Sequence, residues 1–253
     1  QRFNDWYVSA RANFTYNRNK KLYDDKPTPI WPYQSEAGFA YRQQRGLIAL
    51  GLFESEEDIA NSPKQNFGNV RPGDIKYKDQ NGDGKLTDID KIAVKNSSNP
   101  EMTMSLRLGV KYKGFFVNAM FQGVSGYQQQ LTELYTLESG SLQRFQKYHL
   151  TDTWSESNMN ATYPRVKIAN TNDNNRKAST FWVKDCDFIR LKSLSVGYAL
   201  PVSVLKKIKL SSASISLQGS NLCTWSTLKD MDPESLRGYP IQRSYGMTLN
   251  LGF

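Results

Sequence analysis

The 253-residue chain contains one histidine and two cysteines, and this scarcity excludes several kinds of functional site. Cys186 and Cys223 are too few for a disulfide-rich scaffold or a zinc site. His149 has no serine or cysteine motif around it, and a lone histidine is more often a surface or hydrogen-bonded residue than a catalytic base. The segment GNVRPGD (68–74) lacks the Lys-Ser/Thr of a phosphate-binding loop. We therefore predict no catalytic residues and no enzyme.

The chain also lacks long apolar runs and any concentration of basic charge. No stretch of about 18 apolar residues occurs, which excludes a transmembrane helix. Strands of a transmembrane barrel need only about 9 to 11 alternating residues each, so this composition does not exclude them. The net charge is +9, but basic residues such as Arg107, Lys111, Arg190 and Lys192 stand singly. This scatter argues against nucleic acid as a partner.

A signal peptide is also missing from the first residues, QRFNDWYVSARANF, where no basic segment is followed by an apolar one. These residues already alternate between apolar and polar side chains. We therefore expect a fragment or a processed chain.

What the sequence does contain is 12% aromatic residues in a chain whose mean hydropathy is -0.62. This balance is expected where apolar residues occupy alternate positions of strands. Strict alternation predicts six strands, at about 5–16, 103–112, 115–122, 188–200, 211–222 and 244–253. Lys113 and Gly114 are predicted to form a hairpin turn. Arg190 and Lys192 fall in phase with the apolar set of their strand, which predicts either a bulge or a half-strand above a membrane.

The connections between these strands alternate in length. Those at about 113–114 and 201–210 are short, those at about 18–100 and 127–182 are long, and the one at about 226–242 is intermediate. Outer-membrane barrels have short periplasmic turns and long extracellular loops. Aromatic residues stand near the strand ends, as in the girdles of such barrels: Trp6, Tyr16, Tyr112, Phe115, Tyr245 and Phe253. The pattern predicts an all-β fold, a segment of a transmembrane antiparallel β-barrel; the alternative is a soluble, calcium-stabilised β-sandwich that binds carbohydrate.

The segment DQNGDGKLTDID (79–90) follows the ligand order of a calcium-binding loop. The predicted ligands, in the order of loop positions 1, 3, 5, 7, 9 and 12, are Asp79, Asn81, Asp83, the carbonyl of Lys85, Thr87 and Asp90. Gly84 supplies the sharp turn, and Asp90 stands where a longer Glu is usual. We predict a structural Ca²⁺; the alternatives are a turn-rich loop without an ion and, less favoured, a calcium sensor.

Three further features leave alternatives open. Cys186 and Cys223 lie on strands joined by the 201–210 turn, so a disulfide is geometrically allowed, although two separate thiols are favoured. Aromatic residues of the connections either stack on sugars, contact a partner or, as we favour, pack among the loops: Trp31, Tyr33, Tyr127, Tyr135, Trp154 and Trp225. Tyr245 and the terminal Phe253 fit an outer-membrane assembly signal in the last strand, with an ordinary strand end as the alternative.

Six stretches carry a resemblance to a known family, and they cover most of residues 68–253. In order they are GDIKYKDQNGDGKLTDIDK, NPEMTMSLRLGVKYKGFFVNAMFQGVSGY, TDTWSESNMNATYPRV, FWVKDCDFIRLKSLSVGYALP, GSNLCTWSTLKDMDPES and YGMTLNLGF. The combination resembles the C-terminal part of SusC-type TonB-dependent transporters. No single stretch is as specific as the set.

The resemblance implies about six C-terminal strands of a barrel of about 22 strands that an N-terminal plug occludes. Residues 1–253 would lack the plug and the N-terminal regions, so the rest of the barrel is expected from the same protein or another chain, because open sheet edges are not tolerated in lipid. The resemblance further implies the cell outer membrane and its lipid, a SusD-like lipoprotein, TonB, and import of oligosaccharides or peptides. The calcium-binding loop would then lie in a long extracellular loop (18–100).

Overall fold

The structure, a computed structural model, describes residues 2–3, 5–132, 147–166, 174–229, 231–236 and 238–253. These residues separate into two compact units, which we call the strand unit and the loop unit. The strand unit comprises Gln1–Arg18, Asn99–Tyr127 and Asp185–Phe253. The loop unit comprises Asn19–Ser98 and Gln128–Lys184. None of the helices in the described ranges is long and apolar enough to cross a membrane.

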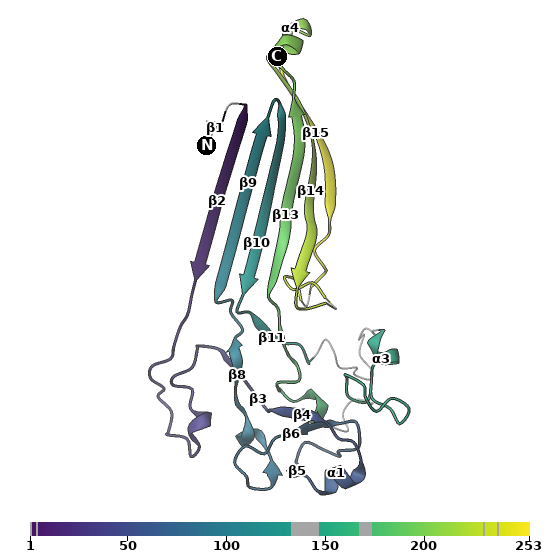
Figure 1. The fold of residues 1–253 in the computed structure, drawn as a ribbon. Coiled ribbons are helices and arrows are strands. Elements are labelled where there is room, and N and C mark those ends of the chain that lie inside the picture. Colours follow the sequence, from purple (N-terminus) through teal and green to yellow (C-terminus); the bar gives the residue numbers. More distant parts are fainter. Residues whose placement is uncertain (1, 4, 133–146, 167–173, 230, 237) are drawn as a thin grey trace. The chain divides into compact units, whose positions relative to one another are not determined.

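The strand unit is one antiparallel sheet with the order β1-β2-β9-β10-β13-β14-β15 in the described residues. Figure 1 shows the long strands of this sheet lying side by side. The bounds are β1 (Arg2–Phe3), β2 (Trp6–Tyr16), β9 (Met102–Tyr112), β10 (Phe115–Ser125), β13 (Phe188–Ala199), β14 (Ser212–Ser226) and β15 (Ser244–Gly252). The all-β class and the six strands predicted from alternation are thus confirmed, with a two-residue addition at the edge.

The short connections lie at one end of this sheet. Lys113 and Gly114 have φ angles of 43° and 90°, and two positive φ angles are what a two-residue hairpin turn requires. A side chain at Gly114 would also collide with the carbonyl oxygen of Ala199, 2.6 Å from the ideal Cβ position. The second short connection contains a helix, α4 (Val202–Lys207), which begins directly after Pro201. The sequence analysis predicted only a turn there.

The predicted bulge lies in β13, whose register against β10 and β14 skips Lys192. Upstream of the bulge, Arg190 pairs with Gln122 on the polar face. Arg190 is only 1% exposed, and its guanidinium donates a hydrogen bond to Asp232 Oδ2 at 2.7 Å. The bulge therefore explains why Arg190 and Lys192 break the phase of the strand.

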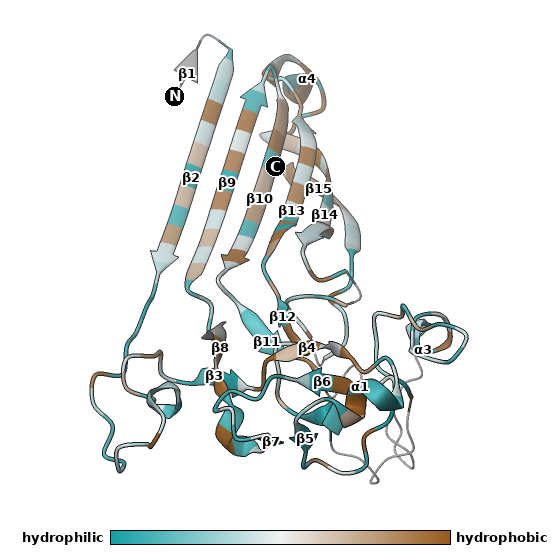
Figure 2. Ribbon diagram, turned by 60° about the horizontal axis from the view of Figure 1, so that its bottom comes forward, coloured by the Kyte–Doolittle hydropathy of each residue, from teal (hydrophilic) through white to brown (hydrophobic). Residues whose placement is uncertain are grey.

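Register converts alternation along each strand into rows across the sheet. One row is apolar throughout: Val8, Val110, Val117, Val196, Leu217 and Met247. Figure 2 shows the resulting alternation of hydrophobic and hydrophilic residues along β2, β9 and β10. The next row on the same face is aromatic: Trp6, Tyr112, Phe115 and Tyr198. Trp6 stacks on Tyr112 with ring centroids 4.3 Å apart. Most of these apolar side chains are exposed, so the sheet does not enclose a core of its own.

The loop unit, by contrast, has a buried core. Its short strands pair as β3-β8, β4-β6, β5-β7 and β11-β12. Their bounds are β3 (Gln43–Gly46), β4 (Ala49–Leu52), β5 (Lys64–Gln65), β6 (Ile75–Tyr77), β7 (Lys85–Leu86), β8 (Ile92–Ser97), β11 (Gln128–Gln130) and β12 (Val183–Asp185). Helices are η1 (Pro32–Gln34), α1 (Glu56–Ala60), η2 (Asp88–Asp90), α3 (Tyr148–Thr151) and η3 (Asn174–Arg176). The fully buried apolar side chains include Leu47, Phe53, Ile75, Tyr77, Leu86, Leu131 and Trp182. The two long segments predicted as loops thus fold together as one unit.

Candidate functional site

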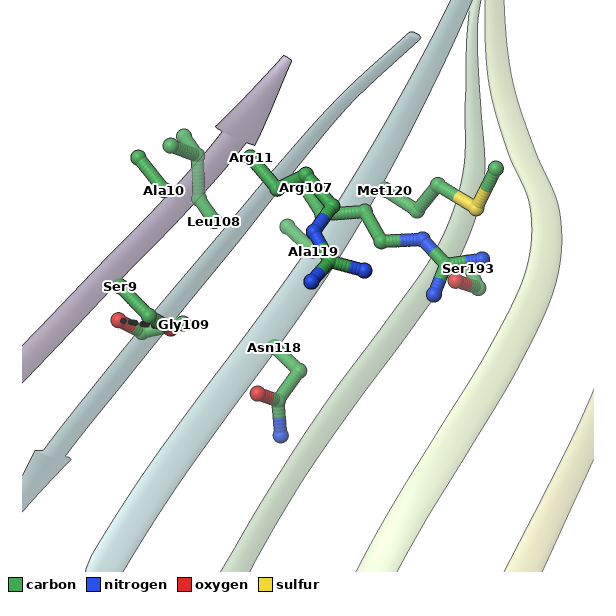
Figure 3. A pocket seen from close by; sticks show the side chains of 10 residues that line it. All are labelled: Ser9, Ala10, Arg11, Arg107, Leu108, Gly109, Asn118, Ala119, Met120 and Ser193. Atoms are coloured by element: carbon green, nitrogen blue, oxygen red, sulfur yellow. Dashed lines mark hydrogen bonds between the residues drawn. The ribbon is translucent and has the colours of Figure 1, made fainter. Parts of the chain in front are cut away.

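The polar face of the strand unit contains a hollow of about 580 Å³. Four neighbouring strands form it: β2, β9, β10 and β13. Register places Arg11 directly opposite Arg107, and the same row continues through Met120 to Ser193. Figure 3 shows both arginine side chains extending over the neighbouring strands, one of them toward Ser193.

The adjacent row, toward the hairpin turn, contributes Ser9, Gly109 and Asn118. A Cβ at Gly109 would lie 2.6 Å from Ser9 Oγ and 3.0 Å from Asn118 Oδ1, so any side chain there would displace these polar groups. Ser9 Oγ donates to the Gly109 carbonyl oxygen at 3.4 Å. The missing side chain of Gly109 therefore keeps the polar floor of the hollow open.

The sequence analysis did not identify this hollow. Arg107 was treated as one of several scattered basic residues, and Arg11 was only a polar position of the first strand. One signal was present, because both arginines fall on polar positions of neighbouring alternating segments. Alternation alone does not fix the register that brings them opposite each other.

The predicted calcium-binding loop, residues 79–90, lies in the loop unit after β6 and contains β7 and η2. Asp79 accepts hydrogen bonds from the backbone N–H groups of Gly82 and Gly84, both at 2.8 Å. Asp83 Oδ1 accepts from the Lys85 N–H at 2.8 Å, and Asn81 Oδ1 accepts from the Asp83 N–H at 3.2 Å. Gly84 has a φ of 77°, a conformation that glycine adopts without strain. The acidic and amide side chains at loop positions 1, 3 and 5 therefore fold the backbone into a tight turn.

Asp90 closes the same loop from its far end. Its side chain accepts from the N–H groups of Gln80 at 3.0 Å and Thr87 at 2.8 Å, and Asp90 is 1% exposed. Thr87 caps η2 by accepting from the Ile89 N–H at 3.2 Å. Position 12 of the loop is thus tied to positions 2 and 9.

The hydroxyl of Tyr33 lies within the electrostatic field of this loop. Burial, and then the negative charges of Asp90, Asp79 and Asp83, raise the pKa of the Tyr33 hydroxyl above its ordinary value. That hydroxyl is buried and has no hydrogen-bond partner among the described residues. The three carboxylates therefore create a common region of negative potential. Still, no three His, Cys, Asp or Glu side chains in the described ranges come together as a group that could hold a metal ion.

The remaining predicted positions are dispersed. His149 is buried in α3 against the ring of Tyr148, with centroids 4.3 Å apart, so it is not a surface residue. No disulfide joins Cys186, which is buried, to Cys223, which is exposed; both lie in the described part of the chain. Tyr245 lies in β15, and the side chain of Phe253 follows that strand at 95% exposure.

The aromatic residues of the connections divide into two groups. Tyr33 stacks on Trp31 with centroids 6.2 Å apart, and Trp154 covers Gly73, where a Cβ would lie 2.3 Å from the indole. These contacts agree with packing inside the loop unit. Trp225 is exposed on β14, whereas Tyr135 lies outside the described residues.

No family model matches the chain, but individual relatives do. The TonB-dependent receptor P3 of Formosa agariphila is 26% identical over 98% of this chain. Two further TonB-dependent receptors of that organism are 29% identical over 75% and 22% identical over 95% of it. The chain spans 27%, 19% and 28% of these three relatives, about a quarter of their length.

Solved structures agree on the fold. A chain of the RagAB peptide importer in its "open-open" state is similar with a TM-score of 0.67 at 22% identity. In the "closed-closed" state the TM-score is 0.69 at 23% identity. Both likenesses cover 100% of this chain, and 27% and 28% of the importer chain.

Proposed function

We propose a function that proceeds from one premise: this chain is a relative of the TonB-dependent receptors, as its motifs predicted. We propose that it forms about six strands of the wall of a SusC-like TonB-dependent transporter in the outer membrane. The other strands and the plug would come from the remainder of a longer protein, in keeping with relatives about four times as long.

The observation that carries this proposal is the exposed apolar face of the sheet. A soluble β-sandwich buries that face against a second sheet. In the described residues of the strand unit there is one sheet, and its apolar rows are exposed, with Leu217 at 64%. Exposed rows of this kind suit contact with lipid, and the aromatic row beginning at Trp6 suits a membrane interface. The alternative, a soluble carbohydrate-binding β-sandwich, would not leave such an apolar face exposed.

The positions of the long and short connections support an assignment of the two ends of the sheet to the two sides of the membrane. The long connections leave the sheet where Tyr16 pairs with Met102, and the short ones lie where Tyr112 pairs with Phe115. In barrels of this class the short turns face the periplasm. We therefore propose that the loop unit is extracellular.

Partners and cargo are part of the same proposal. We propose a SusD-like lipoprotein as partner, energy from TonB, and peptides or oligosaccharides as cargo. The similar importer is described as a peptide importer, which favours peptides. The relatives are receptors, and we propose no catalytic activity.

Uptake by cells tests this function. Cells that carry the full-length protein should accumulate a fluorescent peptide, whereas cells in which its gene is deleted, or in which TonB is absent, should not. The protein should fractionate with the outer membrane and migrate differently on gels before and after boiling. A protein that stays monodisperse without detergent would contradict the proposal.

We further propose that residues 79–90 bind a structural Ca²⁺ that holds part of the loop unit in shape. The ligand order and the pre-turned backbone support this, as does the shared negative potential at Tyr33. Binding would draw Asp79, Asp83 and Asp90 onto one ion.

Hydrogen exchange with Ca²⁺ and after its removal by a chelator tests the calcium proposal. Ca²⁺ should slow hydrogen exchange across residues 79–90 in the full-length protein, and Asp83→Asn, which removes one negative charge from the ligand set, should weaken that protection. Asp88→Asn is the matched control, because Asp88 lies in the same loop at a position that supplies no ligand and pairs with Lys91. Equal protection in both variants would contradict a site at these residues.

A further inference from the structure

We propose that the hollow between Arg11 and Arg107 binds a carboxylate group of the imported cargo. The inference rests on the proposed import function and deepens it, because it names the chemical class that the wall recognises. It concerns only the strand unit, in which all of the lining residues lie.

Arg11 and Arg107 repel each other, and this repulsion has an energetic cost. Like charges directly opposite each other on neighbouring strands destabilise a sheet. Arg11 and Arg107 occupy such a pair, and in the described residues neither makes an ion pair or a side-chain hydrogen bond. An anion between them would offset their repulsion.

The second argument is the contrast with other cations of the strand unit. Four of them have acidic partners: Arg18 with Glu101, Lys113 with Asp5, Arg190 with Asp232, and Lys192 with Glu234. These four cations are neutralised by acids of the same unit, whereas the described residues supply no acid to the pair in the hollow. Two guanidinium groups are left available on one polar face.

The third argument is geometry. A guanidinium presents a planar fork of N–H donors that matches a carboxylate. Asn118, held beside Gly109, adds an amide, and Ser193 adds a hydroxyl on the same row as the arginines (Figure 3). A hollow of about 580 Å³ falls within the size range of small-ligand sites. The hollow therefore combines room, charge and oriented donors.

The chemistry has two sources among the proposed cargoes: the C-terminal carboxylate of a peptide and the carboxylate of an acidic sugar. Binding to the full-length protein should be measured by calorimetry with two pairs of probes. One pair is a five-alanine peptide and its C-terminal amide; the other is trigalacturonate and a neutral trisaccharide. The pair that shows discrimination identifies the source.

We expect the wild-type protein to bind the acidic member of at least one pair about tenfold more tightly, equivalent to about 1.4 kcal/mol. Arg11→Gln and Arg107→Gln should each abolish most of that preference and leave the neutral probe unchanged. Lys111→Gln is the matched control. Lys111 lies on the same strand and face as Arg107 but outside the hollow, so its loss should preserve the preference.

Two results would overturn the proposal. One is a wild-type protein that shows no preference for either acidic probe. The other is that both arginine variants keep the preference for the acidic probe but lose thermal stability. That result would mean that an acidic group in the rest of the protein pairs with the arginines. Peptide uptake with no acid preference would refute the site and leave import standing, whereas acid preference without cellular uptake would refute import and leave the site standing.

Discussion

The two units of this chain treat apolar side chains in opposite ways. The loop unit buries Leu86, Ile75 and Trp182 almost completely, as a water-soluble domain does. The strand unit orders its apolar residues just as strictly, in rows across six strands, yet leaves most of them exposed. The difference shows that apolar side chains can be arranged in regular rows across a sheet without being buried by the protein. A row that is ordered but exposed requires a surrounding medium that accepts apolar surface, which is what the proposed membrane location supplies.

Charged and polar side chains differ between the two units in the same way. In the loop unit, Asp74 is fully buried, and Arg165 donates to it at 2.9 Å, with a further bond from Asn175. In the strand unit, most polar side chains stand on one exposed face, and Arg190 is the main buried cation. Burial opposes ionisation of Asp232, but the hydrogen bonds from Arg190 and from the N–H groups of Glu234 and Ser235 outweigh it and lower the pKa of Asp232.

The largest expected effect tests the buried polar group of the loop unit. Arg165→Ala should remove the Arg165 guanidinium from the buried Asp74 carboxylate and destabilise the loop unit by about 3–5 kcal/mol. Hydrogen exchange of the full-length protein should show faster exchange in residues 43–52 and 75–77. Arg18→Ala is the control, because Arg18 is exposed and stands 4.0 Å from Glu101. Equal effects of the two variants would contradict the expected difference between the buried ion pair of the loop unit and the exposed one of the strand unit.

Deletion of the same side chain in each unit compares their cores directly. Leu86→Ala removes a fully buried side chain and should cost about 2–5 kcal/mol, because a cavity remains. Leu249→Ala, at a position 60% exposed, should cost less, because surrounding lipid or detergent fills the space. Chemical denaturation of the full-length protein, followed by hydrogen exchange in each unit, measures both. Similar costs would indicate that Leu249 has a protein-lined core around it.

Charge insertion on opposite faces of one strand tests the medium. Leu217→Arg should destabilise the folded protein in lipid bilayers by about 2–4 kcal/mol if Leu217 lies near the midplane. Gln218→Arg, one residue along β14 on the polar face, should have little effect. Unfolding by urea in vesicles provides the measurement. The interpretation of the apolar rows fails if both variants behave alike.

The smallest effect concerns pH and the surface of the loop unit. Hydrogen bonds from Lys21 and Lys26 lower the pKa of Glu36 to about 2. A lowered folded pKa contributes stability above the unfolded value of 4.5 that is lost as the pH falls from 4.5 toward 2. Glu36→Gln should therefore cost below about 1 kcal/mol at pH 7, because this ion pair is largely exposed, and less at pH 2, where Glu36 is partly protonated. Glu57→Gln, without a side-chain partner in the described residues, should show no such pH dependence.

Much of the strand unit could be predicted because its signals are local. A strand exposes alternate side chains to opposite sides, so Val8 and Ser9 reveal their faces without reference to any neighbour. Lys113 and Gly114 specify a turn by their own backbone preferences, and the misfit of Arg190 and Lys192 predicted either a bulge or a half-strand above a membrane, of which the structure shows the bulge. The loop unit was not predicted, because it joins segments far apart in the chain, as in the isolated bridge between Leu47 and Ser179.

By itself, therefore, the sequence determined where the long strands lie, which residues share a face, and the ligand order of residues 79–90. Only the tertiary structure decided that Arg11 stands opposite Arg107, that the Tyr33 hydroxyl lies in the field of the carboxylates of Asp79, Asp83 and Asp90, and that the two long connections share one core. The physical reason is that alternation and turn preference are properties of consecutive residues. The register of β2 against β9 is set by contacts between segments about 90 residues apart or more, and no local pattern encodes it.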